Sequence, residues 1–508
     1  MRESFVAIAL TALLMASHLQ AAELDKAALS RLDAYISHAR ASIGIPGVSV
    51  AVVQHGVIVF EKGYGVREAA AAAEAVTPHT VFRIASASKP LGSLLVARLV
   101  DRGVLDWDTR VQALLPGFRA GGDVFARELR VQDLLCLCSG LPETIVGTDL
   151  ARAALSPEAL LDWMGAHLPT AARGERLQYS NESFAAGVYV AVHAAHPDIS
   201  LRAAYDRAIA SDVLVPLGMT DSGSWPAGAA PRNAAQPHAF GPDGSITPIA
   251  LASTASVEPV SPAGGLWSSA HDMARYLLAE LANGRGTDGR QLVSSRNMEY
   301  RRQSRSHAGD GSGYGLGIDI AEDRDVRVLG HTGGIWGYGA DVFFVPAFDA
   351  GAVVLANLGP PFNPLVYGGL RHMLIGLLLG TTDSASGSAA ARQREFLQSW
   401  REEMAGIEFN PDATWVSGIR GVYEDAVYGE IRICPRGGVT VFDAGPWQST
   451  IGRRFSRDSA GTLVLTSPPW LHIPGFEVVT AGGKRRLRMD NLPAPIEFTR
   501  VRACNGGQ

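Results

Sequence analysis

The sequence predicts an α+β fold: an antiparallel sheet flanked by helices, a mostly helical subdomain and a small C-terminal β domain. Three observations predict it. Val-rich alternating segments occur near the start of the chain and again after about residue 325, helical stretches with Gly- and Pro-rich loops fill residues 105–310, and short β-like runs follow residue 415. Because a sheet buries its apolar faces under other elements, the early and late strands most simply join in one sheet with helices packed on it.

Length and composition limit the class of protein. A chain of 508 residues is expected to form two or three domains. With 47% hydrophobic and 19% charged residues, it has the composition of a globular protein with a well-filled core. The formal net charge is −5 and no Lys- or Arg-rich block occurs, so we expect no nucleic-acid partner.

The first 22 residues have the pattern of a secretory signal peptide. Arg2 precedes an apolar run from Phe5 to about Ala16, and small residues follow at Ala21 and Ala22. The run is shorter than a transmembrane helix requires. An uncleaved membrane anchor is the alternative, because Glu3 weakens the positive charge of the segment. We expect removal of residues 1–22, no transmembrane segment in the mature chain, and a periplasmic or secreted location.

The first predicted elements are a hairpin and a helix. Residues 47–65 alternate in polarity, are rich in Val and turn at His55-Gly56, which is typical of a β-hairpin. Residues 86–103 have apolar residues at helical spacing and end at Gly103.

The later elements complete a domain predicted to span residues 23–380. A helix is expected to begin near Ser268 or Ser269 and to end at Gly284. Strands return over residues 326–358, and an apolar helix is expected at about 364–379.

The remaining chain is predicted to hold a linker and a second domain. Residues 381–395 are rich in Ser, Ala and Gly, which is typical of a linker. A short helix follows, and the short β-like runs after it predict a β-rich domain over residues 396–508.

Four cysteines occur in this exported chain. Cys434 and Cys504 lie in the same C-terminal region and could form a bridge. Cys136 and Cys138 flank a single residue, where a bridge would be strained. We therefore expect these two to be buried free thiols. None of the four has a metal-type spacing, so no metal is expected.

The segment Ser86-Ala-Ser-Lys89 places a hydroxyl and an amine three residues apart. Residues at this spacing share one face of a helix. A serine hydroxyl is a weak nucleophile at neutral pH and needs a base within hydrogen-bond reach. The helix start would also favour negative charge at Ser86. Alone, the tetrapeptide is common and is weak evidence of catalysis.

Two further motifs supply polar groups. Tyr179-Ser180-Asn181 can offer a phenol and an amide to one cavity. In the segment His331-Thr332-Gly333-Gly334, a donor and a hydroxyl on a strand edge could bind a carboxylate, and the glycines would let a substrate backbone come close. Each motif alone is more simply explained as a turn or a strand end.

The three motifs together, in this order along the chain, indicate a catalytic site more strongly than each motif does alone. A Ser-x-x-Lys motif, a polar triplet and a Lys-Thr-Gly-like motif are the set found in β-lactamases and penicillin-binding proteins. The chain resembles the serine β-lactamase-like, penicillin-recognising hydrolases of the class C type, which include DD-peptidases, D-aminopeptidases and esterases. "FRIASASK", "PLGMTDS", "PAGGLWSSAHDMARYL" and "GYGLGI" add to the resemblance, which covers about residues 28–375.

The resemblance implies roles for individual residues. Ser86 would be the acylated nucleophile and Lys89 its proton partner. Tyr179 would be the general base or acid that passes the proton to the leaving group, and Asn181 would position the substrate amide. The backbone N–H groups of Ser86 and Gly334 would form the oxyanion hole.

Two departures from the family pattern bear on specificity. His331 stands where class C β-lactamases have lysine, and histidine there is similar to some DD-peptidases, D-aminopeptidases and esterases. His331 and Thr332 would face the substrate carboxylate, with Gly333 beside them, but a neutral imidazole would bind it less strongly than an ammonium. Cys136 and Cys138 stand where the family often has Thr-His in "LLTHTSG", which we expect to affect packing beneath the site and not the chemistry.

The expected function is that of an exported serine hydrolase with an acyl-enzyme on Ser86. The substrate is expected to be a small molecule or peptide, first a β-lactam whose amide is hydrolysed. The alternatives are a DD-carboxypeptidase or D-aminopeptidase acting on D-amino-acid peptides, an esterase, and, outside catalysis, a penicillin-binding sensor or pseudoenzyme without turnover. The mechanism implies no cofactor and no metal.

Overall fold

The computed structural model describes residues 21–504 apart from several short internal segments. The segments outside the description are residues 71–72, 144–154, 308–311, 382–384, 427, 446, 456–460, 469–470, 472–474 and 490–495. The expected signal peptide therefore lies almost wholly outside the described residues. In the described part of the chain, no helix has both the length and the apolar character needed to cross a bilayer.

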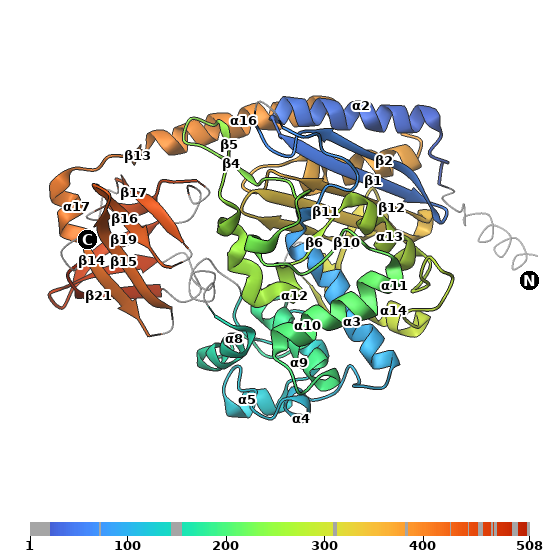
Figure 1. Ribbon diagram of the computed structural model, residues 1–508, viewed down its shortest axis with the longest axis horizontal. Coiled ribbons are helices and arrows are strands. Elements are labelled where there is room, and N and C mark those ends of the chain that lie inside the picture. The colour runs from blue at the N-terminus through green and yellow to red at the C-terminus, as the bar shows by residue number, and fades with distance from the viewer. Residues whose placement is uncertain are drawn as a thin grey trace, which may run out of the picture.

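One antiparallel sheet of eight strands forms the centre of the large domain (Figure 1). Its order is β2-β1-β12-β11-β10-β9-β8-β7. The strands are β1 (Gly47–Gln54), β2 (Val57–Gly65), β7 (Ser306–His307), β8 (Gly313–Tyr314), β9 (Asp319–Asp323), β10 (Val326–Ile335), β11 (Tyr338–Val345) and β12 (Ala350–Ala356). The predicted hairpin is confirmed, and β1 pairs with β12 with Val50 opposite Val354. The early and late strands do join in one sheet.

Helices cover both faces of this sheet. The outer face carries three helices that pack on its buried apolar side chains. They are α2 (Lys26–Ile43), α15 (Leu370–Leu378) and α16 (Ala385–Ala405). All eight residues of β1 are buried, because both faces of this strand are covered.

The helical subdomain packs on the inner face. Its helices are α3 (Ser88–Asp101), α4 (Val111–Leu114), α5 (Asp123–Glu128), α6 (Val131–Leu135), α8 (Pro157–Trp163), α9 (Asn181–Ala195), α10 (Leu201–Ile209), α11 (Val215–Leu217), α12 (Ser261–Gly264), α13 (Ala270–Leu281) and α14 (Ser295–Arg301). Two small ribbons accompany them, β3 (Phe82–Arg83) with β6 (Trp267–Ser268) and β4 (His238–Phe240) with β5 (Ile246–Pro248). The hydroxyl of Ser269 accepts from the N–H of Asp272 at the start of α13, as the sequence predicted.

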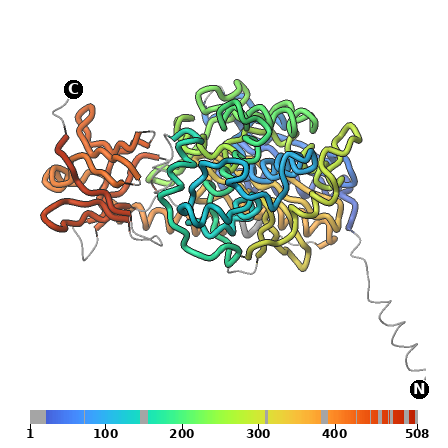
Figure 2. Tube along the Cα trace, turned by 90° about the horizontal axis from the view of Figure 1, so that it is seen from below, coloured from blue at the N-terminus to red at the C-terminus, as the bar shows by residue number. Residues whose placement is uncertain are grey.

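The C-terminal domain is a β-barrel that lies beside the large domain (Figure 2). Its strands are β13 (Ile407–Glu408), β14 (Gly421–Asp425), β15 (Gly429–Arg436), β16 (Val439–Asp443), β17 (Gln448–Arg454), β18 (Thr462–Leu465), β19 (Phe476–Ala481), β20 (Lys484–Met489) and β21 (Ile496–Arg502). In the strand order β13-β17-β16-β15-β14-β21-β20-β19-β18, the last strand, β18, also pairs with β17, which closes the barrel around a core of its own. A short helix, α17 (Ala413–Ile419), precedes β14.

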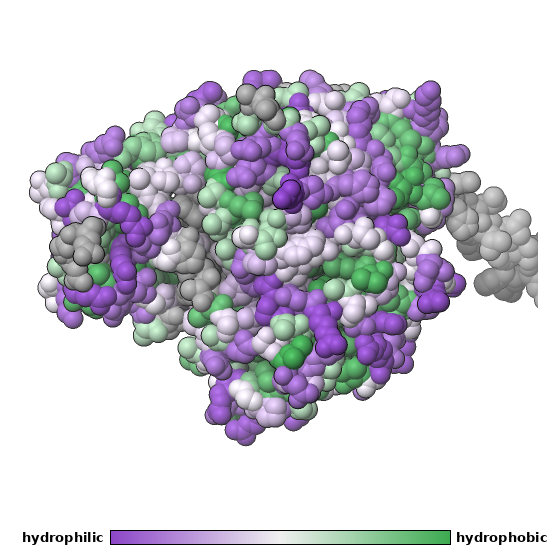
Figure 3. All heavy atoms as spheres, in the orientation of Figure 1, coloured by the Kyte–Doolittle hydropathy of each residue, from purple (hydrophilic) through white to green (hydrophobic). Residues whose placement is uncertain are grey.

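Helix α16 occupies much of the segment that the sequence suggested as a linker. It begins at Ala385 and runs beside α2, where Trp400 and Met404 are buried in the outer apolar cluster. Ala is a strong helix former, so a Ser- and Ala-rich composition is compatible with a helix once an apolar stripe can pack. Hydrophilic residues are spread over the surface of both domains (Figure 3).

Both cysteine pairs are disulfides. Cys434 is bonded to Cys504, the pair that the sequence allowed. Cys136 is bonded to Cys138, so the expectation of free thiols was wrong. The two Cα atoms lie 5.3 Å apart in a turn at Leu137, whose backbone has φ +52°. That separation lies within the range that a disulfide spans.

Candidate active site

The segment before Ser86 is held by a buried arginine. Arg83 lies in β3, and its guanidinium donates to the carbonyl of Gly265 at 2.9 Å and to Thr254 Oγ1 at 3.2 Å. The same group lies 4.6 Å from the ring centroid of Trp267. Burial lowers the pKa of Arg83 to about 10, so it stays charged at neutral pH. This anchoring fixes the chain three residues ahead of the candidate nucleophile, and it places Trp267 in the core.

Ser86 itself lies in a single 3₁₀ turn, Ala85–Ala87, that leads directly into α3. The preceding residue, Ala85, has φ +47°, a left-handed conformation that is unusual for a residue with a side chain. Backbone strain of this kind gathers at functional sites, where the surrounding structure enforces it. Ser86 is half-buried, whereas Lys89 is fully buried on the first turn of α3.

Lys89 is the centre of the site. Its Nζ lies 3.1 Å from Ser86 Oγ, 2.7 Å from the hydroxyl of Tyr179 and 2.7 Å from Oδ1 of Asn181. It also lies 3.0 Å from the carbonyl oxygen of Ala263. The structure thus brings together the side chains of the first two predicted motifs on one amine.

Tyr179 completes a triangle with Ser86 and Lys89. Its hydroxyl donates to Ser86 Oγ at 2.8 Å. Burial raises the pKa of Tyr179 well above its ordinary value, so the resting group is a neutral phenol. The N-cap of α9 sets its position: Ser180 caps the helix by accepting from the N–H of Ser183, which leaves Tyr179 and Asn181 on either side of the cap.

Strand β10 brings the third motif to the same place. From His331 to Ile335 it pairs with β11, whereas β9 pairs with it only up to Gly330. Its other edge is therefore unpaired among the described strands at Thr332, Gly333 and Gly334. A Cβ atom on Gly333 would lie 2.1 Å from the carbonyl oxygen of Ile84, so a glycine is required for the strand to approach the Ser86 turn this closely.

His331 lies behind the site and not at its surface. The side chain is buried, its Nε2 lies 3.1 Å from the hydroxyl of Tyr314 and its Nδ1 lies 2.6 Å from the carbonyl oxygen of Thr332. Burial lowers the pKa of His331, and the charge of Asp319 opposes this only in part, so the imidazole is neutral at neutral pH. Both ring nitrogens are engaged by the protein, whereas Thr332 is half-buried at the strand edge.

Some residues that shape the site were not singled out from the sequence. Tyr314, the partner of His331, lies within the "GYGLGI" segment, but nothing in that pattern indicates a contact with a histidine 17 residues later. Leu137 is another: its carbonyl accepts from the N–H of Gln178 at 2.7 Å, which ties the Cys136–Cys138 turn to the residue before Tyr179.

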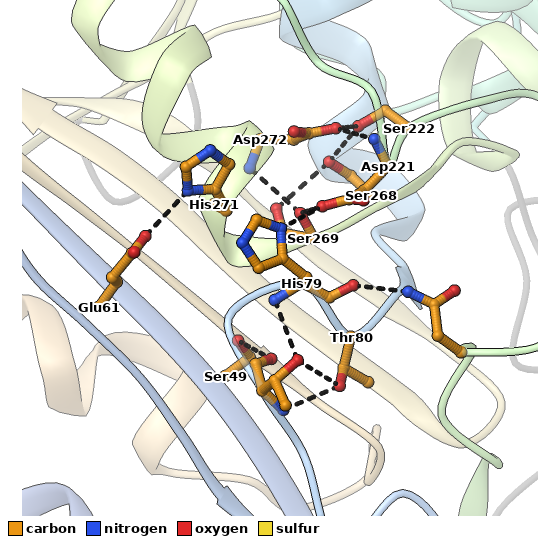
Figure 4. A network of polar contacts seen from close by, with 12 residues as sticks. Ser49, Glu61, His79, Thr80, Asp221, Ser222, Ser268, Ser269, His271 and Asp272 are labelled. Atoms are coloured by element: carbon orange, nitrogen blue, oxygen red, sulfur yellow. Dashed lines mark hydrogen bonds and ion pairs between the residues drawn. The ribbon is translucent and has the colours of Figure 1, made fainter.

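The loop that leads into β3 is tied to three other elements by a polar network (Figure 4). His79 Nδ1 lies 2.8 Å from Asp221, and His271 Nδ1 lies 2.9 Å from Glu61 on β2. The two imidazole centroids are 4.5 Å apart. Within the described residues, no group of three or more His, Cys, Asp or Glu side chains is arranged to hold a metal ion. We interpret this network as support for the loop.

Aromatic contacts join the C-terminal barrel to the surroundings of the site. Trp336, which follows β10, lies 5.6 Å from Trp447 of the barrel between ring centroids, in an edge-to-face arrangement. Tyr428 of the barrel lies 6.4 Å from Trp163 and 6.3 Å from His167 of the helical subdomain. The barrel therefore contacts both the strand side and the helical side of the large domain.

Comparisons with known proteins agree with this geometry. A family model described as Beta-lactamase matches residues 32–374. Esterase EstB of Burkholderia gladioli is 29% identical over 370 residues, which are 66% of this chain and 92% of the relative. Penicillin-binding protein 4 of Amycolatopsis lactamdurans is 27% identical over 334 residues, 62% of this chain and 81% of the relative.

Solved structures share the fold. The octameric penicillin-binding protein homologue from Pyrococcus abyssi superposes with a TM-score of 0.60 at 20% identity, over 93% of this chain and 100% of that chain. The predicted α+β class with an added C-terminal β domain is confirmed.

Proposed function

The chain belongs to the Beta-lactamase family, and from this premise we propose that it is an exported serine hydrolase that forms an acyl-enzyme on Ser86. One observation carries the proposal: Lys89 Nζ lies within hydrogen-bond distance of Ser86, Tyr179 and Asn181 at once. The Ser86 hydroxyl therefore has two titratable groups within hydrogen-bond reach, one to take its proton and one to return a proton to the leaving group.

The proposed first step is acylation. Because Tyr179 rests as a neutral phenol, the reactive form of the pair is the one with one proton fewer, a Tyr179 phenolate held beside the Lys89 ammonium. Ser86 Oγ attacks the carbonyl carbon of the substrate, and its proton passes to this phenolate, which becomes the phenol. The carbonyl oxygen becomes an oxyanion, which accepts from the N–H groups of Ser86 and Gly334. When the bond to the leaving group breaks, Tyr179 delivers the proton to that group.

The proposed second step is hydrolysis of the acyl-enzyme. A water molecule attacks the ester carbonyl, loses a proton to the same pair and releases a carboxylic acid, while Ser86 recovers its hydrogen. The amide oxygen of Asn181 accepts from Lys89, and its N–H₂ group is a donor of the kind that can hold the carbonyl on the acyl side of a substrate.

Two bonds are candidates for the substrate. The β-lactam amide is the prediction made from the sequence, and similarity to a penicillin-binding protein supports it. An ester is the second candidate, favoured by the neutral, internally bonded His331 and by similarity to an esterase. Export to the periplasm or medium remains a proposal based on the N-terminal pattern.

The test is to follow the intact mass of the protein after mixing with benzylpenicillin and, separately, with p-nitrophenyl butyrate, while assaying each compound. We expect Ser86-dependent acylation or turnover of at least one compound, and a loss of at least about 10³-fold in Ser86→Ala. A lasting penicillin adduct would indicate a penicillin-binding peptidase, and drug loss without one a β-lactamase. Undiminished turnover by folded Ser86→Ala would overturn the proposal.

A further inference from the structure

A buried ion pair lies against the strand that carries Thr332. In the register of β10 and β11, Thr332 is opposite Asp341, so both side chains project from one face of the sheet. Helix α15 covers this face, and its Arg371 donates to Asp341 Oδ1 at 2.7 Å. The side chain of Asp341 is 0% exposed and that of Arg371 is 15% exposed. The pair is thus buried behind the strand edge at which a substrate would lie.

The guanidinium of Arg371 is directed at the core. It lies 5.3 Å from the ring centroid of Phe343, two residues along β11 from Asp341. Its Nε is buried and has no hydrogen-bond partner among the described residues. Removing one partner from a buried ion pair is strongly unfavourable. We therefore expect the pair to stay closed when a substrate binds, so that the charge of Asp341 continues to compensate the charge of Arg371.

A further carboxylate, that of Asp319, lies close to the buried His331. Asp319 is 37% exposed, and its Oδ2 lies 3.7 Å from Nδ1 of the neutral His331. The charge of Asp319 also acts across the strand, because it raises the pKa of Arg371 as well as that of Asp341, and it would therefore oppose a substrate carboxylate placed at Thr332. Like charges at short range in a partly buried cleft repel each other.

The ring of Tyr367 lies beside the same strand edge. The hydroxyl of Tyr367 lies 3.4 Å from the carbonyl oxygen of Gly333, and a Cβ atom on Gly334 would lie 2.6 Å from that hydroxyl. Tyr367 is 38% exposed. A partly exposed phenol ring beside the strand edge offers apolar contact to an uncharged group.

We propose that Asp341, by pairing with Arg371, makes the Thr332 end of the cleft select substrates whose leaving group is uncharged over substrates whose leaving group carries a carboxylate. The inference rests on the proposed acyl-enzyme at Ser86 and names its substrate class. Simple esters belong to the favoured class, and penicillins, which carry a carboxylate on the leaving nitrogen's ring, belong to the disfavoured class. Asp341 is a positioning residue, because it acts through the charge of Arg371.

The test compares two esters of phenylacetic acid that differ in one group. The leaving phenol is 3-hydroxybenzamide in one ester and 3-hydroxybenzoate in the other. We measure kcat/KM for both with the wild type, with Asp341→Asn and with Asp349→Asn. The last variant loses the same charge in the turn between β11 and β12, where Asp349 is 48% exposed, at the sheet end away from Thr332.

We expect the wild type to prefer the carboxamide ester, and Asp341→Asn to shift the ratio toward the carboxylate ester by about tenfold or more, since Arg371 then loses its paired carboxylate and keeps only the weaker effect of Asp319 and Asp323. Asp349→Asn should keep the wild-type ratio. An unchanged ratio of kcat/KM for the two esters in Asp341→Asn would overturn this inference and leave the proposed acyl-enzyme on Ser86 standing.

The wild-type protein also provides a test, for the case in which the variant does not fold and for the case in which no compound reacts. If Asp341→Asn does not fold, the wild-type ratio decides, because a wild type that prefers the carboxylate ester contradicts the inference. If neither ester is hydrolysed and Ser86 is not acylated by any of the test compounds, the proposed function fails and the inference fails with it. Loss of both activities in Ser86→Ala shows that the proposed function holds, whatever the ratio.

Discussion

Tyr179 is the residue on which the proposed proton path depends. Its hydroxyl lies between Lys89 Nζ and Ser86 Oγ, at 2.7 and 2.8 Å, and burial keeps the phenol neutral at rest. A hydroxyl in this position can both help remove the proton from Ser86 and return one to the leaving group. Phenylalanine at position 179 would keep the ring and remove this path.

We expect Tyr179→Phe to lower kcat for Ser86-dependent hydrolysis by roughly 10²–10³-fold with little loss of stability, because general acid–base catalysis contributes this much. The measurement is kcat with the ester or drug that the wild type turns over. Tyr205→Phe is the matched control: Tyr205 is fully buried in α10 and its hydroxyl has no hydrogen-bond partner among the described residues. Equal kcat in the two variants would exclude Tyr179 from proton transfer.

At the residue scale, local motifs were predictable and long-range partners were not. Ser86 and Lys89 are three residues apart, so helical geometry alone places them together. The pairing of Asp341 with Arg371 depends on the register of two strands and on the helix after them. A one-residue shift in that register would move Asp341 to the opposite face, and no short sequence pattern fixes it.

At the scale of elements, the Cys136–Cys138 turn connects α6 to the segment that ends at Tyr179. The carbonyl groups of Cys136, Leu137 and Cys138 accept from Ser306 Oγ, the N–H of Gln178 and the N–H of Gly174, at 2.9, 2.7 and 2.7 Å. Two of these contacts hold the segment that ends at Tyr179. The disulfide closes the turn from which they are made.

The two disulfides should therefore affect different properties. Replacing Cys136 and Cys138 by alanine opens a loop of only a few residues, so we expect a stability loss of ~1–2 kcal/mol but a several-fold fall in kcat. Replacing Cys434 and Cys504 opens a loop of 70 residues and should cost about 4 kcal/mol with kcat unchanged. Urea unfolding and kcat of each double variant are the measurements, and an unchanged kcat in the first would exclude a positioning role for the turn.

Helices and strands were predicted correctly where the sequence has a local periodic pattern or a capping residue. The hairpin over residues 47–65 was predicted from alternation and its turn, and α13 from its cap. The linker expected over residues 381–395 is helical from Ala385 onward, and only the short helix expected after it was predicted, because a Ser- and Ala-rich composition is compatible with either state. The pattern also failed at Leu137, whose left-handed backbone is not expected of a leucine.

At the scale of the molecule, the two domains share part of one apolar cluster. Val464 and Leu471 of the barrel region belong to the same buried cluster as Leu32 and Leu374 of the large domain. Trp336 and Trp447 add an aromatic contact elsewhere. An interface with buried residues from both sides couples the stability of the domains.

We therefore expect the full chain to unfold in one cooperative transition in differential scanning calorimetry, with calorimetric and van't Hoff enthalpies in a ratio of about 1. Trp400→Ala, which removes a buried ring from α16, should lower the stability of the whole chain by ~3–5 kcal/mol and shift that single transition. Two separated transitions in the wild type would show that the domains unfold independently. The same would follow if Trp400→Ala shifted only one of two transitions.

The pairing of β1 with β12 has a consequence for the time course of folding. Val50 meets Val354, so the central sheet joins segments separated by about 300 residues of chain. Contacts this distant in sequence form slowly, because a large loop must close before they stabilise anything. During synthesis, the N-terminal hairpin, which ends at Gly65, has to wait for about 290 further residues until β12 is complete at Ala356. A nascent chain without its central sheet exposes apolar surface to chaperones and proteases, and the order of its strands prolongs that period.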